Sequence, residues 1–104
     1  MISHVLRVIF FGLLVIGAQA KASGDAARGA AVGETCLGCH GLTSYSNVYP
    51  TYKVPKLGGQ HAAYLATALK AYRSGERSHP TMRAQASRLS DQDIEDIAAY
   101  FTSL

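Results

Sequence analysis

The sequence lacks tryptophan, has only two cysteines and three prolines, and only 16% of its 104 residues are charged. With 48% hydrophobic residues and a net charge of +3, it does not have the composition of a disordered acidic or basic tail. It also lacks a Lys/Arg-rich run of the kind that indicates nucleic-acid binding. The length allows one small domain, which excludes a multidomain enzyme or a repeat array.

The first twenty residues are typical of a secretory signal peptide. Arg7 gives a basic start, residues 8–18 carry no charge, and residues 18–20 read AQA, a small-x-small cleavage site. The apolar run is shorter than the roughly 20 residues of a membrane-spanning helix. We therefore expect cleavage after residue 20, export to the periplasm, and a mature domain over residues 21–104 without a membrane span. An uncleaved membrane anchor is the alternative.

Residues 36–40 read CLGCH, the C-x-x-C-H pattern of covalent c-type haem attachment. Residues three and four apart share one face of a helical turn, so Cys36 and Cys39 can reach one haem edge while His40 faces the iron. A thioredoxin-like redox pair would need a βαβ setting, and a zinc site would need four protein ligands. A plain disulfide would leave His40 without a role. We therefore expect one haem c, attached through both cysteines and ligated by His40.

The second axial ligand has three candidates in the mature sequence: Met82, His61 and His79. Methionine opposite histidine is a known pairing that raises the reduction potential. Met82 lies in residues 76–89, which we expect to form a loop because Pro80 breaks helix. Filling a core gap is the usual role of a methionine, but beside a haem motif we favour ligation. His79 is expected to be an exposed loop residue, and His61 a surface or packing residue at a helix start.

Apolar spacing predicts an all-α domain with three main helices. Asp25 caps a short helix that leads into the haem motif, a second helix runs from near Gln60 to Gly75, and a capping box at residues 90–93 begins the third. Two stripes repeat at i, i+3, i+4 and i+7: Leu65, Ala68, Leu69 and Tyr72, then Ile94, Ile97, Ala98 and Phe101.

Two long connections, residues 42–59 and 76–89, separate these helices. Bare loops longer than about 12–15 residues are uncommon in compact domains, but a flat apolar cofactor would give them a surface to wrap. The first connection offers candidates for haem or rim contacts: Tyr45, Val48, Tyr49, Tyr52 and Val54.

With these features the chain resembles a monohaem class I cytochrome c of the short bacterial periplasmic kind, and also one half of the dihaem class I proteins. The resemblance covers residues 23–104, and these segments carry it: GDAARG at 24–29, CLGCHG at 36–41, PKLGGQ at 55–60, and Met82 followed by LSDQDI at 89–94 and AAYF at 98–101. It implies the class I fold, in which three main helices and long loops enclose one covalently attached haem.

The resemblance also implies roles for single residues. Gly29 would let the first and last helices cross closely, with Tyr100 against it. The Pro55 carbonyl would accept a hydrogen bond from the ring of His40, a contact that orients the ligand and raises its basicity. One departure from the family is Gly33, where an aromatic residue is common. The helix crossing is therefore expected to be looser there, or filled by another tyrosine.

In the family Met82 would be the sixth ligand, so that with His40 it leaves no coordination site open for a substrate. The expected function is a periplasmic one-electron carrier between respiratory or dehydrogenase partners, and not an enzyme. Three alternatives remain: a haem enzyme or gas-binding protein with an open sixth site, a fixed electron-transfer subunit of a dehydrogenase complex, and a thiol oxidoreductase without haem.

The charges are unevenly distributed along the chain. Residues 53–88 hold seven Lys and Arg against one Glu, a balance of +6, whereas residues 89–104 hold four acids and no base, a balance of −4. This dipole would orient the basic side toward a redox partner that carries an acidic docking patch.

We therefore predict that association with such a partner slows as salt rises, because ions screen the attraction between exposed charges. Stopped-flow electron transfer at increasing ionic strength measures this rate. A rate that stays constant from low to high salt would remove electrostatic steering from the account.

Overall fold

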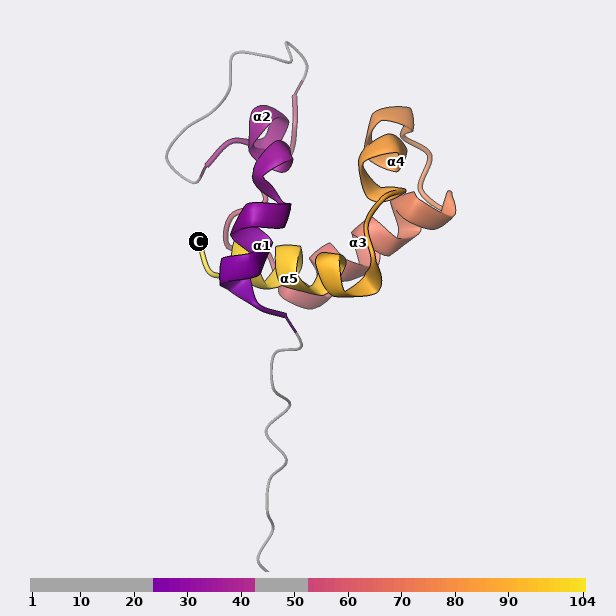
Figure 1. Cartoon of the computed structure of the whole chain (residues 1–104). Coiled ribbons are helices and arrows are strands. Elements are labelled where there is room, and N and C mark those ends of the chain that lie inside the picture. The colour runs from indigo at the N-terminus through magenta and orange to yellow at the C-terminus, as the bar shows by residue number, and fades with distance from the viewer. Residues whose placement is uncertain (1–23, 43–52) are drawn as a thin grey trace, which may run out of the picture.

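The computed structural model describes residues 24–42 and 53–104. Within these residues every element is helical: α1 (Ala26–Val32), the short 3₁₀ turn η1 (Glu34–Cys36), α2 (Leu37–His40), α3 (Ala62–Ser74), α4 (Pro80–Ala86) and α5 (Asp91–Thr102) (Figure 1). The all-α prediction is confirmed. The expected signal peptide (residues 1–20) lies outside the described residues, as do Tyr45, Val48, Tyr49 and Tyr52.

The helices form two walls on a common floor. α1 packs across α5, α3 packs along α5, and α4 packs on α3. Figure 1 shows α1 and α2 rising at one end of the α3–α5 pair and α4 rising at the other. The buried core lies between α3 and α5 and consists of Leu65, Ala66, Ile94, Ile97, Ala98 and Phe101. No helix in the described part of the chain is long and apolar enough to cross a membrane.

The helix ends follow local sequence signals. The Asp25 side chain accepts backbone hydrogen bonds from the first turn of α1. Gly75 ends α3 with a left-handed backbone at φ +87°, which glycine adopts without strain. The capping box is present at α5, where Ser90 and Asp93 satisfy each other's backbone N–H groups. These three predictions are confirmed.

The prediction of a continuous loop over residues 76–89 is wrong, because α4 occupies Pro80–Ala86. Pro80 begins this helix instead of breaking it: the first helical position needs no N–H donor, and the proline ring already holds φ near the helical value. His79 precedes it as the N-cap, and its Nδ1 accepts a hydrogen bond from the Met82 backbone N–H at 3.2 Å. Met82 therefore lies in the first turn of the short helix α4.

The crossing of α1 and α5 is close because Gly29 has no side chain. A Cβ at Gly29 would lie 1.9 Å from the backbone oxygen of Asp96, a distance that no real Cβ tolerates. The close crossing implied by the resemblance is thus confirmed. The atoms nearest to this position belong to Asp96 and Ile97, however, and not to Tyr100.

The crossing is also well filled at Gly33, which is buried. A Cβ there would lie 3.4 Å from Cγ1 of Ile97 and 3.6 Å from the ring of Phe101. The expectation of looser packing, or of a tyrosine filling the space, is wrong. The nearest atom to such a Cβ would be the backbone oxygen of Gly29 at 2.9 Å, and the nearest side chains belong to Ile97 and Phe101 of α5 and not to a tyrosine.

A buried carboxylate joins α1 to α5 beside this crossing. Asp96 is fully buried, and it accepts hydrogen bonds from the backbone N of Asp25 and from Nε2 of Gln92, both at 2.8 Å. Arg28 adds an ion pair. The Asp25 N–H, followed by Arg28, lowers the pKa of Asp96, so this carboxylate stays charged and satisfied inside the protein.

We predict that Gly29→Ala destabilises the fold by about 1–3 kcal/mol, the usual range for forcing extra atoms into a packed site. Gly38→Ala is the matched control, because a Cβ at Gly38 meets nothing within 4 Å. Guanidinium unfolding of the two haem-containing variants gives the comparison. Equal unfolding free energies for both variants would show that the crossing does not require glycine.

Candidate functional site

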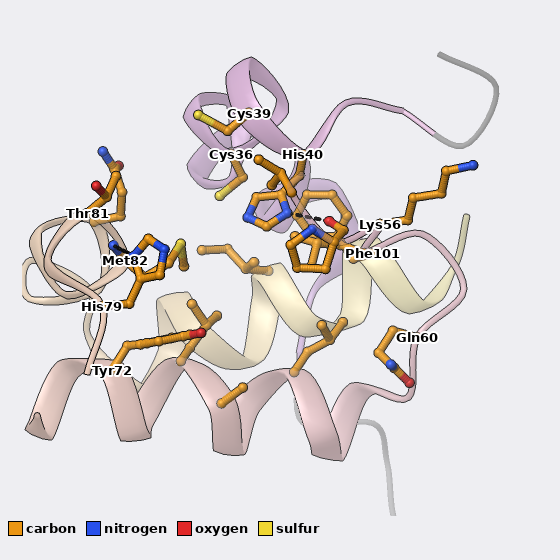
Figure 2. Close-up of a pocket in the computed structure, with 18 of the residues that line it drawn as sticks. Cys36, Cys39, His40, Lys56, Gln60, Tyr72, His79, Thr81, Met82 and Phe101 are labelled. Carbon is orange, nitrogen blue, oxygen red and sulfur yellow. Dashed lines mark hydrogen bonds between the residues drawn. The ribbon is translucent and has the colours of Figure 1, made fainter. Parts of the chain in front are cut away.

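A cavity of about 270 Å³ lies between the two walls. Figure 2 shows Cys36, Cys39 and His40 on one wall and Met82 on the other, with Tyr72 and Phe101 on the α3–α5 floor. All five site residues predicted from the sequence line this one cavity: Cys36, Cys39, His40, Pro55 and Met82. Residues that are far apart in the sequence are therefore brought to one place.

The two cysteines are free thiols with different exposure. Cys36 is half-buried and packs against the hydrophobic core, whereas Cys39 is exposed. Burial raises the pKa of the Cys36 thiol, so this sulfur is held in its protonated form. Because no disulfide joins them, both sulfurs are available for thioether bonds.

The ring of His40 is held in place by a backbone carbonyl group at Nδ1, the nitrogen that is not expected to bind the iron. Its Nδ1 lies 2.6 Å from the Pro55 oxygen. A carbonyl oxygen only accepts hydrogen bonds, so Nδ1 carries the proton and Nε2 keeps its lone pair for a ligand. The short helix α2 ends directly after His40 at Gly41, whose φ of +68° suits glycine. The chain thereby turns away and leaves the ring beside the cavity.

Met82 reaches the cavity from the opposite wall. It is half-buried and belongs to α4. Figure 2 shows its sulfur and the His40 ring on opposite sides of the cavity. His79 also lines the cavity, although it is an exposed N-cap residue, whereas His61 precedes α3 and does not line it.

The floor of the cavity is the apolar stripe of α3. Leu65 is buried and its partners in the stripe are half-buried, and all four line the cavity: Leu65, Ala68, Leu69 and Tyr72. Arg77 lies over the Tyr72 ring, 4.6 Å from its centre. The stripe predicted as a core-facing surface therefore faces the cavity along most of its length. A flat apolar group in the cavity would complete its burial.

These residues fit a haem c. They provide two free thiols on one helical turn, an imidazole nitrogen, a thioether across the cavity, and an apolar floor. These are the attachment groups and axial ligand types that a c-type haem takes. Within the described residues, no group of three or more His, Cys, Asp or Glu side chains could hold a metal ion alone.

The sequence reasoning missed several lining residues, including Thr35 and Gln85. Both positions had a signal. Thr35 directly precedes Cys36, and Gln85 lies three residues after Met82, so it shares a helical face with it. The signal at Gln85 depends on a helix at this place, whereas the sequence predicts a loop over residues 76–89.

Comparison with known proteins shows the family to which the chain belongs. Residues 26–104 match the family model named Cytochrome c. Cytochrome c-554(548) of Halomonas halodenitrificans is 46% identical over 84 residues, which cover 78% of this chain and 98% of that protein. Cytochrome c4 of Pseudomonas aeruginosa is 42% identical over 93 residues, which cover 88% of this chain but 45% of that protein.

Among solved structures, reduced recombinant cytochrome c4 from Pseudomonas stutzeri superposes with a TM-score of 0.60 at 35% identity, covering 78% of this chain and 51% of that one. The chain thus spans about half the length of the cytochromes c4, in keeping with its resemblance to one half of a larger class I protein. The chain belongs to the cytochrome c family, as a class I electron carrier with covalently attached haem c and not as an enzyme.

Proposed function

We propose that the chain is a periplasmic one-electron carrier in which Cys36 and Cys39 hold the haem while His40 and Met82 ligate its two faces. The observation that carries this proposal is the placement of His40 and Met82 on opposite walls of one cavity. With a protein ligand on each face, no position is left for a substrate. Periplasmic location rests on the predicted signal peptide.

When bound, the haem supplies a one-electron couple between ferric and ferrous iron. The Pro55 carbonyl holds the His40 ring in one orientation and raises its basicity through the Nδ1 hydrogen bond. The soft thioether of Met82 favours the ferrous state and so raises the reduction potential. With a protein ligand on each face in both oxidation states, the chain would have little to rearrange during transfer.

The apolar floor contributes by excluding water. Leu65, Leu69 and Phe101 line the cavity from α3 and α5, and they lower the local polarity around the iron. Burial and dielectric are among the factors through which a protein tunes the potential of a haem.

The partner surface is the basic rim of the cavity. Three cations away from the cavity are paired with acids of α5: Arg28 with Asp93 and Asp96, Lys70 with Glu95, and Arg73 with Asp91. Lys53, Lys56 and Arg77 line the cavity instead, and none of them has an ion-pair partner among the described residues. Unpaired positive charge beside the haem site favours a redox partner with an acidic patch.

We predict that Met82→Ala abolishes the weak far-red ferric absorption band that reports a methionine–iron bond, and that it lowers the reduction potential. The matched variant is His79→Asn, which removes the rival imidazole ligand but keeps a residue that caps helices well. This variant should retain the band. Absorption spectra and redox titration of both purified proteins give the answer.

A different result would favour another function. If the unmodified protein has covalent haem but no such band, a high-spin ferric spectrum and ready carbon monoxide binding would indicate an open sixth site. The chain would then be a haem enzyme or a gas-binding protein. If the unmodified protein lacks the band but has a low-spin ferric spectrum, and His79→Asn alone turns that spectrum high-spin, the ligand would be assigned to His79.

A further inference from the structure

Among the described residues, the helices of the two cavity walls pack on the floor and not on each other. α4, which carries Met82, packs on α3 and on no other described helix. The wall with the haem motif is joined to α5 through α1. Figure 1 shows α2 and α4 standing apart at opposite ends of the α3–α5 pair. The position of Met82 relative to His40 therefore depends on whatever joins these walls across the cavity.

One side chain spans this gap. The guanidinium of Arg88 donates a hydrogen bond from one nitrogen, Nη2, to Oγ1 of Thr35 at 3.2 Å and to Oε1 of Gln85 at 3.3 Å. Thr35 directly precedes Cys36 on the motif wall, and Gln85 lies one turn beyond Met82 on α4. Among the described residues, the Arg88–Thr35 bond is the only hydrogen bond that joins residues 76–89 to residues 33–42.

Both partners of Arg88 line the cavity, so the bridge crosses at the site itself. Arginine suits this place because its planar group presents several donors in fixed directions and can hold two acceptors at once. A lysine at the same position would offer a point charge without that geometry. The bridge thus has the chemistry of a clamp between two segments that are distant in sequence.

We propose that Arg88 is a positioning residue that latches the α4 wall to the haem-motif wall and so keeps Met82 on the iron. This proposal rests on the proposed ligation by Met82. Met82 dissociates when α4 moves outward, and the Arg88–Thr35 bond must break for that movement to occur.

Arg88 also carries a positive charge close enough to Cys36 to lower the pKa of that thiol against the larger, raising effect of burial. Removing Arg88 therefore changes the electrostatics of the site as well as the latch. The two effects are separated at Thr35, because Thr35→Val removes the acceptor, keeps the side-chain shape and leaves the charge of Arg88 in place.

The experiment is a titration of the ferric haem-containing protein with imidazole. Binding is measured as the decrease of the far-red absorption band. Imidazole binds only to molecules from which Met82 has dissociated, so its apparent affinity reports the open fraction. We expect Arg88→Gln and Thr35→Val each to raise that affinity about three- to tenfold, the factor that corresponds to one net hydrogen bond. The variant with both substitutions should bind imidazole about as tightly as either single variant, since the two substitutions remove the same hydrogen bond.

The control is Arg83→Gln, which removes the same charge from α4 itself, whereas Arg88 lies just after the end of that helix at Ala86. The Arg83 guanidinium lies beside Gly75, away from Thr35, so this variant should bind imidazole as the unmodified protein does. The latch is overturned if Thr35→Val leaves the affinity unchanged, or if Arg83→Gln raises it as much as Arg88→Gln does. An unmodified protein that lacks the methionine band would instead contradict the proposed function.

Discussion

The close crossing of α1 and α5 is the constraint on which the rest of the structure depends. Gly29 lets the two backbones approach to a distance that no larger residue permits. The buried Asp96 of α5 ties the same two helices together by accepting a hydrogen bond from the backbone N–H of Asp25 and pairing with Arg28. The direction of α1 fixes where η1 and α2 follow, and hence where the thiols and the imidazole lie. The position of the haem motif thus depends on the α1–α5 crossing, which lies outside the haem cavity.

The hydrophobic core is incomplete without a group in the cavity. Small domains bury a modest share of their surface, and here the buried hydrophobic cluster lies at the junction of α3 and α5. The stripe of α3 lies half-buried along the cavity, where Leu69 and Tyr72 face space suited to a flat apolar group. The haem is therefore part of the core, which couples cofactor retention to stability.

Signals that act over a few residues were predictable from the sequence. The capping box at Ser90, the end of α3 at Gly75 and the haem motif at residues 36–40 each depend on neighbours within one turn. Pro80 was misread because proline both breaks a helix interior and favours a helix start, and the sequence does not say which applies. The hydrogen bond from Arg88 to Thr35 could not be predicted from the sequence, since it joins segments that only the fold brings together. The roles of residues 1–20 and of the tyrosines in residues 43–52 stay predictions.

The central claim is that the iron has one nitrogen ligand and one sulfur ligand from this chain, contributed by opposite walls of one cavity. X-ray absorption at the iron edge of the haem-containing protein, in both oxidation states, tests this claim most directly. The account predicts one sulfur and five nitrogen neighbours, four of them from the porphyrin, with the sulfur retained on reduction. Six nitrogen neighbours, or five without a sulfur, would contradict ligation by Met82 and the electron-carrier mechanism built on it.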